Sequence, residues 1–210
     1  STAGSGTPSI TTALTNFGND WNTIVINGYG MQSTNLASLN SFNGRPDIST
    51  PTGRYAGIIM KPFIAICGSV ADNDSSTTDA MLDDLTIAVA PAPYSEGIQY
   101  EAAGNMAYIF ANILATSPSS DVSKMSYLDM PMPLAANLPN VTMNSATSRN
   151  TYVKMGNSTV SIVAGRYQIE DFVTTYHPTG ENPPIFRYCR DILGVDMNVY
   201  YSWLQLEQLY

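Results

Sequence analysis

The chain has 210 residues and a mass of 22.7 kDa, a length that fits one domain. Hydrophobic residues make up 44% of it, and the mean hydropathy is −0.06, so the composition supplies a buried core and excludes global disorder. No apolar run approaches the roughly 20 residues that cross a bilayer, so the sequence predicts no membrane span.

Charged residues are scarce and mostly acidic. They make up 12% of the chain, against a usual share of about 25%, so Ser, Thr and Asn must supply most of the polar surface. Nine basic residues stand against 17 acidic ones, for a net charge of −8. Proteins that bind nucleic acid cluster Lys and Arg against the phosphates. Here the basic residues are scattered, which argues against a nucleic-acid partner.

The N-terminal quarter predicts two helices around one strand. A Thr-Pro pair and Gly18 mark the start and the end of a short helix over 7–18. The β-branched run 21–27 predicts a strand, and apolar residues at helical spacing predict a second helix over 33–42. Residues 45–57 are rich in Pro, Gly, Ser and Thr and predict a loop.

The middle of the chain predicts buried strands and a long helix. The runs 62–67 and 85–90 are continuously apolar, as in strands that are covered on both faces. A helix begins near Ser95, shows apolar residues at steps of three and four, and ends by Pro118. Strands that alternate with helices at this spacing indicate α/β layering.

The C-terminal half begins with residues 116–144, where several prolines and the lack of a period predict a long surface excursion. A short helix is expected over 145–155. Two alternating runs, 158–163 and 167–176, are joined across a glycine and predict a β-hairpin. A mostly helical segment over 185–210 follows. We therefore expect one α/β domain over 1–210, a mixed β-sheet flanked by helices, with a C-terminal β-hairpin followed by a long helix.

Motifs for catalysis or cofactor binding do not occur in the sequence. The only histidine is His177, and no Gly-x-Ser-x-Gly elbow or phosphate-binding loop is found. Zinc sites need three or four Cys or His ligands, whereas this chain has three such residues, far apart in sequence. Cys67 and Cys189 fall in apolar runs and are interpreted as buried, reduced thiols. The sequence therefore predicts neither an enzyme nor a cofactor.

One acidic run and several short patterns have both a functional and a structural interpretation. The run from Asp72 to Asp83 has the oxygen spacing of a calcium loop, but Thr77 takes the place of its glycine. A solvated loop that leads into a helix cap explains the same residues.

Two pairs of adjacent carboxylates, Asp83–Asp84 and Glu170–Asp171, suit acid–base work only if the fold pairs them with other groups. The Asn-x-Ser/Thr patterns at Asn73, Asn140 and Asn157 are expected by chance in this composition.

The order of the segments carries a family resemblance. Thr-Pro-Ser-Ile-Thr-Thr-Ala-Leu at 7–14 precedes a Trp-led strand that ends at Tyr29, and 54–65 leads into the next strand. Leu-Thr-Ile-Ala-Val-Ala-Pro at 85–91 is followed by Pro-Tyr and an Ala-rich helix.

The most specific segments are Ser-Arg-Asn-Thr-Tyr-Val-Lys-Met-Gly at 148–156 and Ile-Glu-Asp-Phe-Val-Thr-Thr-Tyr at 169–176. Together, over about four fifths of the chain, these segments resemble the sheath protein of contractile phage tails, in the Mu-like branch of the myophage tail sheath family. Sheaths of related contractile injection systems are similar.

This resemblance implies a structural role. Copies would stack as rings around an inner tube, between a baseplate and a tail terminator, and would contract to drive the tube through a cell envelope. Such a protein is assembled in the bacterial host cytoplasm and resides in the virion, with no cofactor or metal. The family's N-terminal domains, terminal arms and C-terminal completion have no counterpart in 1–210, and the first residue is Ser1, so we expect a fragment or a processed product.

An aromatic contact surface is expected near Tyr200, Tyr201 and Trp203, because tyrosine is enriched and charge is depleted at interface cores. The chain has 13 tyrosines, although tyrosines also cover ordinary cores. Two other functions stay open at this point, an α/β hydrolase-like enzyme and a secreted ligand-binding module that uses surface Asn and Tyr.

Overall fold

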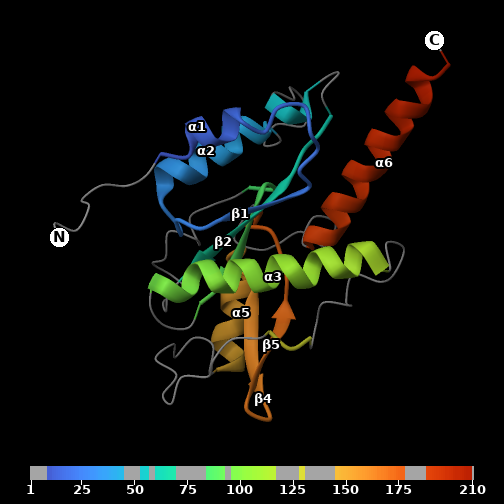
Figure 1. The fold of residues 1–210 in the computed structure, drawn as a ribbon. Coiled ribbons are helices and arrows are strands. Elements are labelled where there is room, and N and C mark those ends of the chain that lie inside the picture. Colours follow the sequence, from blue (N-terminus) through green and yellow to red (C-terminus); the bar gives the residue numbers. More distant parts are fainter. Residues whose placement is uncertain are drawn as a thin grey trace.

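A parallel three-stranded sheet lies at the centre of the fold (Figure 1). The structure is a computed structural model, and it describes residues 9–44, 53–56, 60–69, 84–92, 96–116, 128–130, 145–177 and 188–209. The strands are β1 (Ile24–Asn27), β2 (Ile64–Ser69) and β3 (Ile87–Pro91), in the order β1-β2-β3.

Every residue of β2 and β3 is buried, as the two apolar runs predicted. Both strands begin two residues later than those runs do. The reason for β2 is that the backbone N–H and carbonyl of Phe63 are bound by the side chain of Asn43 and not by a neighbouring strand. Pro91 is the last residue of β3, opposite Ser69, and it ends the strand because it has no N–H to donate.

One face of the sheet is covered by α1 (Thr11–Thr15) and α2 (Ser33–Asn43). Cys67 and Ile87 point into this smaller core. Helix α2 is one residue longer than the predicted helix, and it ends at Gly44, which has a left-handed φ of 71°. Helix α1 is shorter than the predicted 7–18, and the start of that prediction lies outside the described residues.

The opposite face of the sheet carries the larger core. Ile66 and Ala88 point into it, against α3 (Glu96–Thr116). This helix has the start and length that the sequence predicted. Within the described part of the chain, no helix combines the length and the apolar character needed to cross a membrane.

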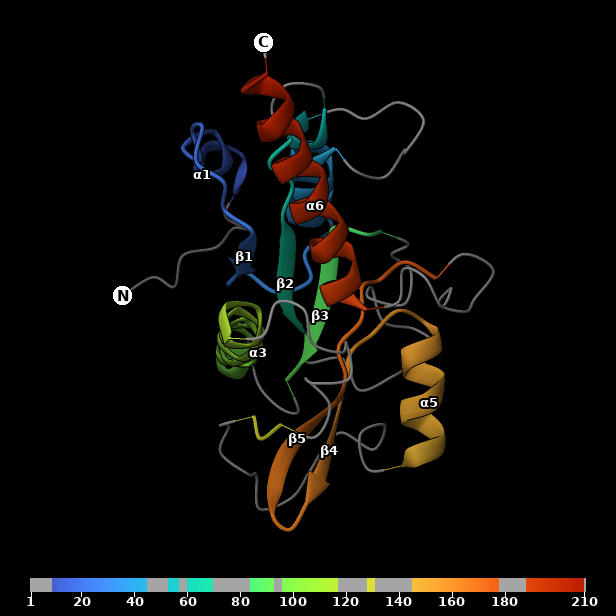
Figure 2. The same cartoon turned by 90° about the vertical axis from the view of Figure 1, so that its right-hand side faces the viewer.

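The C-terminal third consists of α5 (Ala146–Lys154), the hairpin strands β4 (Thr159–Val163) and β5 (Arg166–Asp171), and α6 (Cys189–Glu207). Figure 2 shows α5 beside the hairpin. The hairpin turns at Ala164 and Gly165, which have φ values of 49° and 77°, as a type I′ turn requires. The predicted hairpin and the long helix after it are confirmed.

The second hairpin strand ends at Asp171 and does not continue to residue 176. Beyond it, the Thr175 N–H donates to the Ile87 carbonyl at 2.8 Å, and Ala88 forms an antiparallel bridge with Thr174. The hairpin is thereby joined to β3. The chain thus combines parallel and antiparallel pairing, in agreement with the predicted mixed architecture. Most of the predicted excursion over 116–144 lies outside the described residues.

The predicted loop 45–57 contains a short 3₁₀ helix, η1 (Gly53–Tyr55). It forms around Arg54, which is buried. The guanidinium donates to the backbone carbonyls of Gly18 at 3.0 Å and Lys61 at 3.1 Å, and also to that of Asp20. These carbonyls are distant in sequence, so local composition does not reveal the helix.

Asn43 connects α2 to the sheet. Its Nδ2 donates to the Phe63 carbonyl at 3.0 Å and to the Thr86 Oγ1 at 2.8 Å, while its Oδ1 accepts from the Phe63 N–H at 3.0 Å. All three residues are buried. Removing the amide would leave a backbone N–H and a carbonyl without partners.

We predict that Asn43→Ala lowers the free energy of unfolding by about 2–4 kcal/mol. Asn40→Ala is the matched control on the same helix, because the Asn40 Oδ1 has no hydrogen-bond partner among the described residues. It should change that free energy by less than about 0.5 kcal/mol. Chemical denaturation of both variants measures the difference, and equal losses would contradict the assignment.

Helix α3 approaches β2 most closely at Gly68. A Cβ built there would lie 1.8 Å from the Gln99 carbonyl oxygen, which is backbone and cannot swing away. Gly104 on α3 has no atom within 4 Å of such a Cβ. Of these two glycines, only Gly68 is required by packing.

Gly68→Ala should therefore lower the free energy of unfolding by about 3 kcal/mol or more, through displacement of α3. Gly104→Ala should raise it by up to about 1 kcal/mol, because alanine is the better helix former. Thermal unfolding of the two variants tests the pair, and a tolerated alanine at position 68 would show that the contact is wrong.

Candidate functional site

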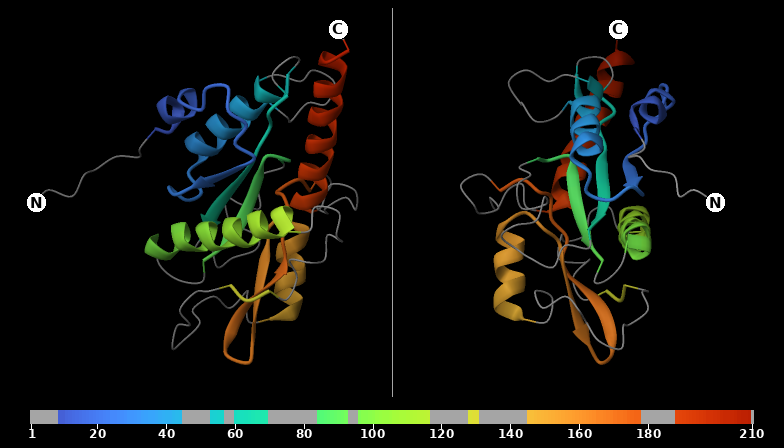
Figure 3. Two further views of the ribbon diagram at one scale, coloured as in Figure 1. Left: turned by 45° about the vertical axis from the view of Figure 1, so that its right-hand side comes forward. Right: turned by 90° about the vertical axis from the view of Figure 1, so that its left-hand side faces the viewer.

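Helix α6 extends well beyond the sheet, and its C-terminal end is the outermost part of that side of the molecule (Figures 1 and 3). Its first turns are anchored by buried residues, among them Cys189, Ile192 and Leu193. After Asp196, no described residue of α6 is fully buried. The second half of the helix is therefore a surface feature.

An aromatic cluster attaches this second half to the body. The ring of Tyr200 lies 4.3 Å from that of Trp21, centroid to centroid, and Trp203 follows at 6.4 Å from Tyr200. The Trp21 Nε1 donates to the Pro62 carbonyl at 2.7 Å, just before β2. The cluster thus joins residues that lie almost 180 positions apart in the chain.

The three residues of the predicted contact surface differ in their environment. Tyr200 and Trp203 are half-buried in the cluster. Tyr201 has its ring 5.8 Å from that of Tyr200 and is 54% exposed. Only Tyr201 points mainly toward solvent, and a role of all three in assembly stays a prediction.

Strand β1 is the edge of the parallel sheet, and none of the described residues pairs with its outer side. The Thr23 carbonyl accepts from the Ile64 N–H at 3.1 Å, so the alternation of the ladder turns the backbone groups of Ile24 and Ile26 outward. The Ile26 side chain is 48% exposed. A short row of backbone donors and acceptors is therefore available along this edge.

An apolar hollow of about 150 Å³ lies beside β1, between this strand and α1. Its lining includes Ile10, Phe17, Val25, Ile26 and Leu39. A strand placed along β1 would bring alternate side chains toward one face, and the hollow has room for an apolar one. Neither the edge nor the hollow was visible in the sequence, because the edge depends on the order of the strands and the hollow on the position of α1.

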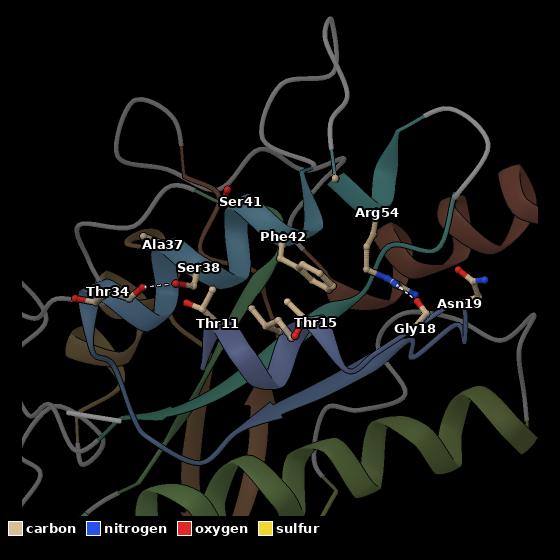
Figure 4. A pocket seen from close by; sticks show the side chains of 12 residues that line it. Thr11, Thr15, Gly18, Asn19, Thr34, Ala37, Ser38, Ser41, Phe42 and Arg54 are labelled. Carbon is tan, nitrogen blue, oxygen red and sulfur yellow. Dashed lines mark hydrogen bonds between the residues drawn. The ribbon is translucent and has the colours of Figure 1, made fainter. Parts of the chain in front are cut away.

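A larger groove, of about 810 Å³, lies between α1 and α2 and ends at η1 (Figure 4). It exists because the side of α2 that borders it carries small side chains, at Thr34, Ala37, Ser38 and Ser41. Leu14 from α1 and Phe42 from α2 also line it. The sequence analysis missed this groove. The spacing of small residues along 33–42 was the one available signal.

Among the described residues, two charged side chains have a pKa displaced by their surroundings. Burial lowers the pKa of Arg54, and the Asp20 carboxylate partly opposes that shift. On the hairpin, the Gln168 amide and the Arg166 guanidinium donate to Asp129 at 3.0 and 2.8 Å. Those hydrogen bonds hold the pKa of Asp129 below its usual value.

A second ion pair joins α5 to β5. The Arg149 Nε lies 2.5 Å from the Glu170 Oε2, and the pair is partly buried. One member of the predicted carboxylate pair Glu170–Asp171 is thus bound to a cation, while the other accepts from the Tyr188 hydroxyl at 3.5 Å.

The remaining sequence candidates are placed as follows. The His177 Nδ1 lies 2.5 Å from the Thr175 carbonyl oxygen. Cys67 and Cys189 are buried and are not joined in a disulfide, as predicted. Asn157 is buried, and its Nδ2 donates to backbone carbonyls of α5 and of the residue after it. The Asp84 Oδ1 accepts from the Thr86 N–H at 2.5 Å.

The calcium-loop candidate 72–83, together with Asn73 and Asn140, lies outside the described residues. Among the residues that are described, no three His, Cys, Asp or Glu side chains are grouped so that they could hold a metal ion.

Comparison with known proteins gives no family assignment: neither a scan against protein-family models nor a search of the curated proteins finds a match. Function is therefore inferred from the residue pattern and from the surfaces described above.

Tyr200→Ala should detach the second half of α6 from Trp21. We expect faster amide hydrogen exchange over 197–207 and a loss of about 1–3 kcal/mol in the free energy of unfolding, from lost ring contact and burial. Tyr201→Ala is the control, since its ring is mostly exposed and should cost less than about 0.5 kcal/mol. If the exchange rates of the two variants agree, the cluster does not anchor α6.

Proposed function

We propose that this protein is the α/β core of a contractile-tail sheath subunit. Copies would stack as rings around an inner tube and drive it through a cell envelope when the assembly contracts. The order of the sequence segments suggests this family, and the unpaired edge of β1 is the structural observation that carries the proposal. Subunits of the family that the sequence resembles pair their terminal arms as strands with neighbouring subunits, and such pairing needs an open sheet edge.

The β1 edge is short, with four residues, but it lacks the side-chain devices that protect many exposed strands. Edge strands usually carry Lys, Pro or a bulge, which block pairing with another chain. The segment from Trp21 to Tyr29 contains no charged residue and no proline. A strand added here would gain main-chain hydrogen bonds along β1 and side-chain contact in the neighbouring hollow. The edge therefore suits strand addition between copies.

The surface composition suits contacts that break and re-form. A contracting sheath releases free energy when its subunits repack from one helical lattice into another. Uncharged polar and tyrosine-rich surfaces can exchange neighbours without leaving a desolvated charge unpaired. The inner tube protein, the baseplate and the tail terminator are the other partners of this proposal. The virion, assembled in the bacterial host cytoplasm, is the proposed location.

The first test is assembly of the purified protein. We expect hollow, striated tubes or stacked rings in electron micrographs of the concentrated full-length protein, which would carry the terminal arms of the family. Ile26→Lys should abolish them, because it places a charge beside the open edge and at the hollow. Val163→Lys is a matched control at the hairpin, with 47% exposure against 48% for Ile26, and it should assemble like the native protein.

Two outcomes would contradict the proposal. One is a protein that stays monomeric at high concentration and binds a small ligand saturably, as a ligand-binding module or a hydrolase-like enzyme would. The other is assembly that Ile26→Lys leaves unchanged, which would remove the β1 edge as the observation that supports the function.

A further inference from the structure

A row of apolar side chains follows the exposed side of α6. Val195, Val199, Leu206 and Leu209 are 53%, 38%, 56% and 78% exposed. With Ser202, they recur at steps of four, three, four and three residues. This spacing places Val195, Val199 and Leu206 on one face of α6, and Leu209 follows just past the end of the helix. We call these four apolar residues the α6 stripe. Their exposure shows that the aromatic cluster leaves these side chains open to solvent.

The stripe lies on an almost uncharged stretch of helix. Between Met197 and Leu209 the only charged side chain is Glu207. The whole chain carries a net charge of −8, so two copies repel each other except where uncharged surfaces meet. The stripe offers no charged group to a partner, so the surface complementary to it is uncharged and apolar.

The α1–α2 groove is such a surface. Leu14, Ala37 and Phe42 line it together with uncharged hydroxyl side chains. Arg54 is the one charged residue among the described residues that line it, and it donates its guanidinium hydrogens to backbone carbonyls. The groove is concave and the stripe is convex. In Figures 1 and 3, α6 and the pair α1–α2 lie on opposite sides of the sheet, so the stripe does not reach the groove of its own molecule.

We infer that the α6 stripe of one copy packs into the α1–α2 groove of the next. Two different surfaces of the same chain then meet, and this heterologous contact continues into a helical array unless it closes into a ring. The inference rests on the proposed sheath function and adds a contact that is separate from the β1 edge. One helix face is a small interface, so a single pair of copies should bind weakly. Repetition along an array should strengthen it.

The test uses one variant for each side of the contact. Leu206→Glu places a charge on the stripe, and Ala37→Glu places one in the groove. Gln205→Glu and Ala111→Glu are the matched controls, on α6 beside the stripe and on exposed α3. All four positions are exposed, so circular dichroism and thermal unfolding should match the native protein. In sedimentation, each stripe or groove variant should associate at least tenfold more weakly than the native protein and the controls.

Mixing the two variants distinguishes this contact from other forms of self-association. Leu206→Glu keeps an intact groove, and Ala37→Glu keeps an intact stripe. An equimolar mixture should therefore form a one-to-one dimer that grows no further through this contact. If Leu206→Glu weakens association but Ala37→Glu does not, or if the mixture stays as dissociated as its components, the stripe does not enter the groove.

Electron micrographs of tubes test the proposed sheath function independently of the contact between the stripe and the groove. Tubes that form equally well from the native protein and from both variants overturn this contact and leave the proposed function intact. A native protein that remains monomeric at every concentration overturns both.

Discussion

Helix α3 rests on the sheet where Gly68 leaves room for the backbone of Gln99. A methyl group at this point would force the two segments apart, so the distance between the helix and the sheet depends on a missing side chain. The hairpin and the first turns of α6 share one apolar core with α3. The positions of the hairpin and of α6 therefore depend on the close contact between α3 and β2. The direction in which α6 extends from the sheet depends on it as well.

Neutral side chains make many of the interior polar connections in this charge-poor chain. Asn43 joins α2 to the sheet, and the Asn27 Nδ2 donates to the Gly30 carbonyl at 2.9 Å at the end of β1. The Ser158 hydroxyl both donates to the Val173 carbonyl and accepts from its N–H. Amides and hydroxyls satisfy buried backbone groups without the cost of desolvating an ion. A low charge is thus compatible with a well-connected interior.

The low content of charged residues also affects the surface of the molecule. The edge of β1, the α6 stripe and the α1–α2 groove are three surfaces of different form, and nearly all of their side chains are uncharged. An acidic chain whose copies must come together needs contact surfaces of this kind, because charge elsewhere opposes the approach. A sheet edge gives directional hydrogen bonds, whereas an apolar stripe in a groove gives contact area. The two modes can act on different neighbours.

Local pattern by itself determined most of the elements: the buried strands β2 and β3, the helices α2 and α3, the hairpin turn, and the α/β class. These follow from periodicity, β-branching and glycine positions, which act within a few residues. Only the tertiary structure decided the rest. The short helix η1 forms because Arg54 reaches distant carbonyls, β5 ends where the chain turns to pair with β3, and Trp21 meets Tyr200 from the far end of the sequence. Grooves and open edges depend on how elements that are far apart in sequence lie relative to one another. A local sequence pattern does not specify the distances between such elements.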